Sequence, residues 1–243
     1  MKTPEDGGAA PETHAKLLSM IPQGKPVERV ILSAAALIGE HPAIIADGQL
    51  YPHAGQRMAL LDRALPDVTV ELFVGLCNPG TFIPKALMQL SDPQRRAVVT
   101  STDLSCLGWL PMIEDIRDLA PDVKITLWRN EDSPLIWGDI LRAIADVPQD
   151  TPVVNEFGLL SSLVSEAGQH QIEMAAEVAP SERDATFREA LAQVFQDHAL
   201  PEAIEEELDL PGWSNDLVAA FTELYEQDVA RLQSMPDIRF LAP

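Results

Sequence analysis

The stretch Val68-Thr-Val-Glu-Leu-Phe-Val-Gly-Leu-Cys-Asn-Pro-Gly-Thr81 decides the fold class of this 243-residue chain. From Leu72 it is almost continuously apolar, which is typical of a strand that is covered on both faces. Asn78 is a favoured N-cap and Pro79 a favoured first helical residue, so a helix is expected to follow directly. Pro84 lies inside this helix and predicts a kink or an early end.

Strand-like and helical segments alternate on both sides of this stretch. Upstream, the β-branched run Val27–Ser33 is a predicted strand, and Arg57–Leu65 has helical spacing. Downstream come a helix at Leu110–Leu119 and a strand at Val123–Trp128. A further helix is expected to run to about Ile144, with Ser133 as its N-cap and Pro134 as its first residue. Strands joined by helices of this length run parallel. The sequence therefore predicts an α/β fold with a short, mostly parallel sheet and flanking helices.

After about residue 150 the chain is expected to be mainly helical. A capping-box pattern at Ser181–Asp184 opens one helix. A last long helix starts at Ser214, and Ile238–Leu241 is expected to return to an edge of the sheet. We therefore divide the chain into a flexible tail (1–11), an α/β core (12–155) and an acidic helical C-terminal region packed on that core (156–243).

The chain is strongly acidic, and its charge is unevenly distributed. The net charge is −21, and residues 143–243 hold 20 Asp and Glu against 4 Lys and Arg. Binding to nucleic acid and to anionic membranes depends on Lys and Arg, so neither partner is expected. The acidic surface is then either a solvated face that keeps the protein soluble or a docking face, at about residues 181–233, for a basic protein partner.

Other features of the sequence predict a cytoplasmic protein. No segment has the roughly 20 apolar residues that a membrane span needs, and the first residues lack the apolar stretch of a signal peptide. The two cysteines, Cys77 and Cys106, fit a reducing compartment. The unpaired edge of a sheet that begins at Val27–Ser33 predicts either a homodimer or a covering helix at His14–Ile21.

Two corners of the predicted sheet carry the candidate binding residues. Ligands of open parallel sheets bind beyond the carboxyl ends of the strands, where loops lead into helix N-termini. The free N–H groups and the positive end of such a helix favour a small anion, and an arginine would add a bidentate donor. The candidates are Asn78, Thr81 and Lys85 at the first corner, and Arg129 and Ser133 at the second.

A purely structural interpretation of the same corners stays open. In it, Asn78 and Ser133 only cap helices, while Arg129 pairs with Glu131 or Asp132. Residues of these types are common at helix starts and turns for that reason alone.

The sequence offers few candidates for catalytic groups. Cys77, which precedes a helix N-terminus, is either a thiol with a lowered pKa or a small buried apolar residue. The five histidines have no metal-ligand spacing, so no metal site is predicted. Catalytic residues therefore stay unassigned.

Both corners resemble elements of the sulfotransferases. The segment Leu72–Lys85 is similar to that family's strand–Arg-Asn/Asp-Pro–helix element, and Leu127–Trp137 is similar to a later stretch of uncharacterised bacterial sulfotransferase-like proteins. The resemblance implies a P-loop-type α/β fold. It also implies a donor, adenosine 3′-phosphate 5′-phosphosulfate, whose 3′-phosphate would bind at the first corner.

The chain departs from this family at the residues that hold the donor. Cys77 stands where the family has an arginine directly before Asn/Asp-Pro, and Lys85 stands where a serine usually assists. The N-terminal phosphate loop of the family has no counterpart in the sequence. Each lost charged hydrogen bond weakens binding by about 1.5–3 kcal/mol. We therefore expect a relative that binds no cofactor.

Three functional hypotheses follow. The first is a diverged sulfotransferase-like protein that does not bind the sulfonate donor and has no assigned role. The second is an active transferase that uses Lys85, Arg129 and the helix N-termini to hold an anionic, nucleotide-type donor for a hydroxyl acceptor. The third is an acidic protein–protein interaction module.

Overall fold

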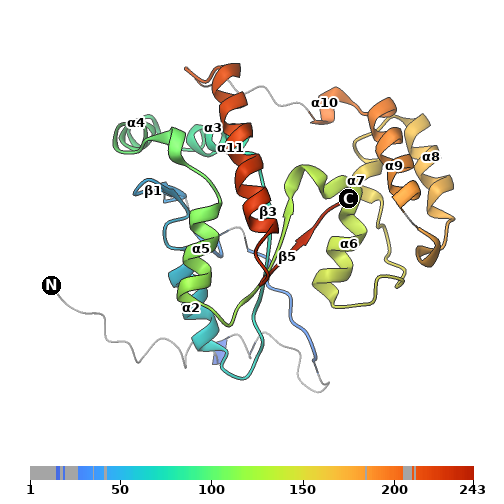
Figure 1. The fold of residues 1–243 in the computed structure, drawn as a ribbon, viewed down its shortest axis with the longest axis horizontal. Helices are drawn as coiled ribbons and strands as arrows, with labels where there is room; N and C mark the ends of the chain where they lie inside the picture. Colours follow the sequence, from blue (N-terminus) through green and yellow to red (C-terminus); the bar gives the residue numbers. More distant parts are fainter. Residues whose placement is uncertain are drawn as a thin grey trace.

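At the centre of the molecule is a three-stranded parallel sheet in the order β3-β4-β5 (Figure 1). Its strands are β3 (Glu71–Leu76), β4 (Lys124–Arg129) and β5 (Ile238–Leu241). The prediction of an α/β fold with a parallel sheet is therefore confirmed. The computed structural model describes residues 15, 16, 19, 27–34, 36–40, 43–183, 185–204, 210 and 212–243.

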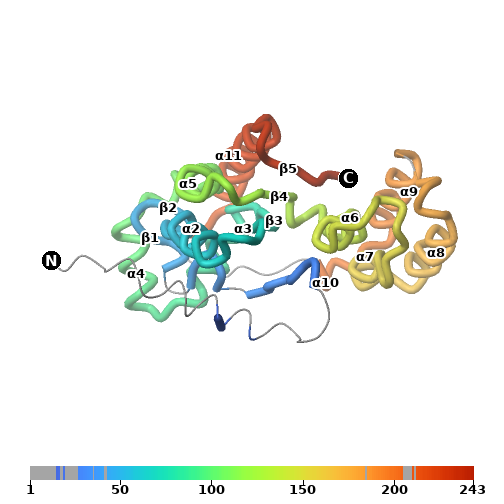
Figure 2. The backbone as a smooth tube through the Cα atoms, turned by 90° about the horizontal axis from the view of Figure 1, so that it is seen from below, coloured from blue at the N-terminus to red at the C-terminus, as the bar shows by residue number. Residues whose placement is uncertain are grey.

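Helices from both halves of the chain cover one face of this sheet (Figure 2). The strands alternate, so that Leu72 and Leu127 point into this side, where they pack with Phe221 in the main hydrophobic core. A short antiparallel pair of strands lies beside these helices. The elements on this side are β1 (Ile45–Ala46), β2 (Gln49–Leu50), α2 (Ala54–Ala64), α3 (Pro79–Met88), α5 (Leu110–Leu119) and α11 (Asn215–Gln233).

Helix α6 (Ser133–Ala145) covers the opposite face of the sheet. Phe73, Trp128 and Leu241, one from each strand, pack against it. Because neighbouring residues of β3 enter different cores, the strand is covered on both faces, as its apolar run predicted.

Three further helices form a lobe beyond α6 with a small core of their own (Figure 1). They are α7 (Gly158–Ser161), α8 (Glu166–Ala176) and α9 (Ala185–His198), and Leu135 of α6 joins them. Helices α4 (Asp92–Ser101) and α10 (Pro201–Ile204) are also present. No helix in the described part of the chain is long and apolar enough to cross a membrane.

The predicted strand at Val27–Ser33 is wrong. The segment is irregular, with a bend at Glu28, and Ile31 is 62% exposed. Only Arg29 is anchored, through hydrogen bonds to Glu71 (2.8 Å) and to the carbonyl of Ile144 (3.1 Å). A β-branched run favours a strand, but it becomes one only where its backbone pairs with a neighbouring strand, and the described sheet (β3-β4-β5) does not include this segment. The covering helix predicted at His14–Ile21 lies mostly outside the described residues.

Helix α3 continues through Pro84 to Met88, so the early end that this proline permits does not occur. A proline inside a helix leaves the carbonyl four residues earlier without its N–H partner. That carbonyl belongs to Gly80, and it accepts a hydrogen bond from the indole nitrogen of Trp213 (2.8 Å). A side chain 133 residues away in sequence thus supplies the hydrogen bond that Pro84 cannot donate.

The end of the chain is part of the sheet layer. The predicted return of Ile238–Leu241 to a sheet edge is confirmed, because β5 pairs in parallel with β4. Helix α11 begins after Ser214, as predicted, and packs on α3. Helix α9 begins at Ala185, but Asp184 of the predicted capping box lies outside the described residues.

Candidate functional site

The two predicted corners meet at the carboxyl ends of β3 and β4. The last residues of these strands, Leu76 and Arg129, are register partners, so the loops that follow leave the sheet side by side. The backbone N–H of Asn78 donates a 2.6 Å hydrogen bond to Glu131 Oε1, which ties the two corners together. Both corners therefore lie at the same edge of the sheet, as predicted from the sequence.

Asn78 is the N-cap of α3, as predicted. Its Oδ1 accepts from the N–H of Gly80 (2.8 Å), and its carbonyl accepts from the hydroxyl of Thr81 (3.0 Å). Its Nδ2 donates to the hydroxyl of Thr222 in α11 (2.9 Å). The cap side chain is therefore bound on both sides, once within α3 and once across to α11.

Glu131 is the centre of the hydrogen-bond network at this edge. One of its oxygens accepts from Asn78, and the other lies 3.0 Å from the hydroxyl of Tyr225. The same hydroxyl lies 2.7 Å from the carbonyl of Leu76 at the end of β3. Burial, followed by the charge of Glu131, raises the pKa of Tyr225. Tyr225 is therefore a neutral hydrogen-bond donor at any physiological pH.

Arg129 is bound by a carboxylate that the sequence analysis did not consider. Its guanidinium donates two hydrogen bonds to Glu226 of α11, at 2.7 and 2.5 Å, and lies 5.7 Å from the ring centroid of Tyr225. The hydrogen bond with Glu226 raises the pKa of Arg129 above its usual value. The predicted pairing with Glu131 or Asp132 is therefore replaced by a bidentate ion pair across the site.

Ser133 and Lys85 belong to the helices that follow the two corners. Ser133 is the first residue of α6 and not its N-cap, because a 3₁₀ turn (Asn130–Asp132) precedes it. Its buried hydroxyl accepts from the indole nitrogen of Trp128 (2.9 Å). Lys85 lies in the last turn of α3, and its charge lowers the pKa of Cys77 slightly against stronger opposing effects.

The side chains that sequence reasoning missed come mainly from α11. Thr222, Tyr225 and Glu226 follow the helical spacing i, i+3 and i+4, so they lie on one face of that helix, and that face meets the sheet edge. This spacing was the available signal. Nothing local in the sequence connected it with Asn78 or Glu131.

Trp109 anchors the end of β3 from the side of α5. Its indole nitrogen donates a 2.6 Å hydrogen bond to the carbonyl of Cys77. Its own backbone N–H and that of Leu110 donate to Asp228 of α11, at 2.8 and 3.2 Å. Asp228 thus satisfies N–H groups at the start of α5, which has no side-chain cap of its own.

The thiol of Cys77 is poorly suited to nucleophilic chemistry. Burial raises its pKa to about 11, with a further contribution from the charge of Glu131. Of the two interpretations of Cys77, the geometry favours the buried apolar residue over the reactive thiolate.

This raised pKa leads to a prediction about thiol labelling. At pH 8 about one Cys77 thiol in a thousand is ionised, so we expect iodoacetamide to modify exposed Cys106 first and to leave Cys77 intact. Modification of Cys77 should rise steeply as the pH approaches 11. Peptide mass spectrometry of the folded chain, with urea-unfolded chain as the control, measures both rates. Rapid modification of Cys77 at pH 7 would restore the reactive-thiol interpretation.

Carboxylates dominate the chemistry of this edge. Glu226 and Asp132 act on Arg129, Glu131 acts on Asp132, and burial raises the pKa of Asp132. No group of three or more His, Cys, Asp or Glu within the described ranges is arranged to hold a metal ion. Comparisons with models of protein families, with curated proteins and with solved structures found no match for the chain.

Proposed function

We propose that this chain is a diverged sulfotransferase-like protein that does not bind a sulfonate donor. The proposal rests on one observation. The groups that a donor phosphate would use at the carboxyl ends of the strands are already bound by carboxylates of the chain itself. Glu131 accepts from the backbone N–H of Asn78, and Glu226 binds the guanidinium of Arg129.

Charge repulsion also opposes the binding of a donor phosphate at this edge. An incoming phosphate would have to displace Glu226 from a bidentate pair and would then lie beside Glu131 and Asp132. Two like charges about 4 Å apart repel by about 4 kcal/mol at an effective dielectric constant of 20. Arginine at the position of Cys77, which the family uses to offset such charge, is missing. Loss of donor binding is the interpretation that these contacts favour.

The proposal predicts the outcome of a calorimetric titration. We expect the purified chain to give no binding heat with adenosine 3′,5′-bisphosphate at millimolar concentration, and none with AMP as the control nucleotide. Binding in the micromolar range with selectivity over AMP would refute the proposal. It would favour the rival hypothesis, an active transferase in which Lys85 and Arg129 hold an anionic donor.

Two paired variants test whether the internal carboxylates are the cause. The double variant Glu131→Ala/Glu226→Ala frees the N–H of Asn78 and the guanidinium of Arg129, so we expect weak bisphosphate binding to appear in the millimolar range. The variant Glu114→Ala/Asp118→Ala removes two exposed charges from α5 and is the matched control. Equal responses of both variants would mean that net charge alone governs phosphate binding and that the occupancy argument is wrong.

A further inference from the structure

A hollow of the described surface lies in the helical lobe, away from the sheet edge. It is a groove of about 800 Å³ between the loop that precedes α7, the helix α8 and the turn after α8. Phe157, Ile172 and Val178 contribute apolar lining, while Glu173 and Glu177 of α8 contribute carboxylates. A space of this volume is in the range of sites that take up ligands.

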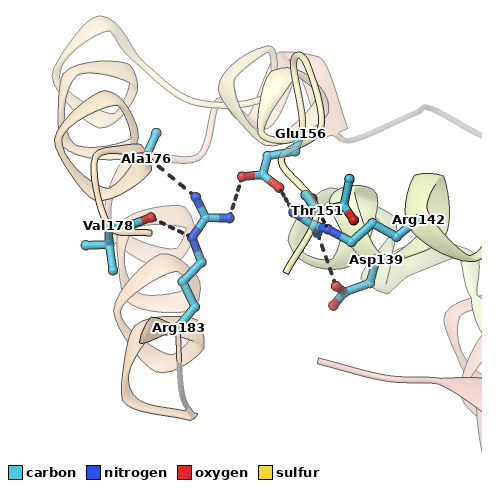
Figure 3. A network of polar contacts seen from close by, with 7 residues as sticks. All are labelled: Asp139, Arg142, Thr151, Glu156, Ala176, Val178 and Arg183. Atoms are coloured by element: carbon cyan, nitrogen blue, oxygen red, sulfur yellow. Dashed lines mark hydrogen bonds and ion pairs between the residues drawn. The ribbon is translucent and has the colours of Figure 1, made fainter. Parts of the chain in front are cut away.

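The side chain of Arg183 forms part of one wall of the groove (Figure 3). The guanidinium of Arg183 lies 5.0 Å from the ring centroid of Phe157 and 5.2 Å from that of Phe187. It donates to Glu156 and to the carbonyl of Val178 (3.0 Å), just past the C-terminus of α8. Aromatic faces, a carboxylate and the negative end of a helix are the groups that bind guanidinium well. The wall of the groove is therefore a cation site that Arg183 occupies.

The two carboxylates of α8 that line the groove, Glu173 and Glu177, do not pair with Arg183. The side chain of Glu173 is 77% exposed, and its Oε2 lies 3.8 Å from Nδ1 of His170. Neither Glu173 nor Glu177 pairs with a Lys or Arg of the described chain. Residues 143–182 contain seven Asp and Glu and no Lys or Arg at all. The field around the groove therefore attracts cations and repels acidic ligands.

We propose that this groove is the docking site for a basic, partly apolar segment of a partner protein. Lys or Arg of the segment would pair with Glu173 and Glu177, and its apolar side chains would lie on the half-buried Phe157 and Val178. A peptide fits better than a small cation because the apolar surface continues past the groove. Val154, between two lining residues, is 94% exposed. The inference is independent of the donor-site proposal, because the two sites share no residue.

The test is fluorescence anisotropy with labelled peptides and the full chain. The probes are twelve-residue peptides in which six Arg and six Leu are permuted, with Glu/Leu and Arg/Ser peptides of equal length as controls. We expect micromolar binding of Arg/Leu peptides only, weakened at least tenfold in 1 M salt. The Debye length falls from about 10 Å at 0.1 M to about 3 Å at 1 M, which screens exposed pairs.

Variants locate the site. We expect Glu173→Gln/Glu177→Gln to weaken binding at least fivefold and Ala176→Trp, which fills the groove without changing charge, to weaken it at least tenfold. Glu114→Gln/Asp118→Asn, two exposed carboxylates four residues apart on α5, should leave binding unchanged. Circular dichroism should show all variants folded. No binding by any Arg/Leu peptide, or equal loss in the α5 control, would overturn the proposal.

Discussion

Replacement of Glu156 by alanine is expected to destabilise the chain by about 3–5 kcal/mol. Glu156 is 9% exposed and accepts from two guanidinium groups, those of Arg142 and Arg183 (Figure 3). Arg142 is 4% exposed and is otherwise held by the carbonyl of Thr151 at 2.8 Å and more weakly by Asp139 at 3.4 Å. Without Glu156, two poorly solvated cations face each other across the junction of α6 and the helical lobe.

Urea unfolding measures this effect. Glu156→Gln keeps an acceptor but removes the charge, so we expect an intermediate loss of stability. Glu189→Ala in α9 removes an exposed carboxylate from the same lobe and should change the free energy of unfolding by less than about 0.5 kcal/mol. If Glu156→Ala were as mild as Glu189→Ala, the network would have no part in joining the lobe to α6.

The second large effect is expected at Trp109. Its ring is 3% exposed and packs against Phe82 (5.0 Å between centroids) and Tyr51 (6.2 Å). Trp109→Ala removes this volume and the 2.6 Å hydrogen bond to the carbonyl of Cys77. Replacing a buried aromatic side chain by alanine lowers the free energy of unfolding by about 3–5 kcal/mol. For a chain of this size the melting temperature should fall by roughly 6–20 °C.

Phenylalanine separates the two contributions. Trp109→Phe keeps most of the ring packing but leaves the Cys77 carbonyl without its donor, which costs about 1–3 kcal/mol. Trp137→Phe is the matched control, because Trp137 lies in α6 and is only partly buried at the core between α6 and the sheet. Equal losses for the two phenylalanine variants would show that the indole hydrogen bond contributes nothing to the corner.

The site and the groove lead to different kinds of function. At the sheet edge, α11 closes the corner with Thr222, Tyr225 and Glu226, and these contacts favour an edge that no longer takes up a phosphate. In the helical lobe, Glu173 and Glu177 of α8 pair with no Lys or Arg of the described chain and lie beside apolar side chains. Together the two proposals describe a chain that acts through surface contacts with a protein partner.

Short sequence patterns predicted the structure correctly where the pattern and its result lie within one helix or strand. Asn78 followed by proline starts α3, and the apolar run before it is a strand with both faces covered. The helices at Leu110–Leu119 and after Ser214 were likewise readable from spacing and caps. Val27–Ser33 has an equally strong local pattern but no strand, because a strand also needs a neighbour that the pattern does not contain.

Only the tertiary structure determined which side chains meet at the site. The partner of Arg129 is Glu226, 97 residues away, and the partner of Tyr225 is Glu131, 94 residues away. The chain offers 38 Asp and Glu to 17 Lys and Arg, so composition leaves each arginine many possible carboxylates. Hydrophobic burial brings α11 across the carboxyl ends of the strands, but it is non-directional and carries no information about pairing. Local propensity therefore defined the elements and their caps, whereas the packing of α11 selected the ion pairs that close the site.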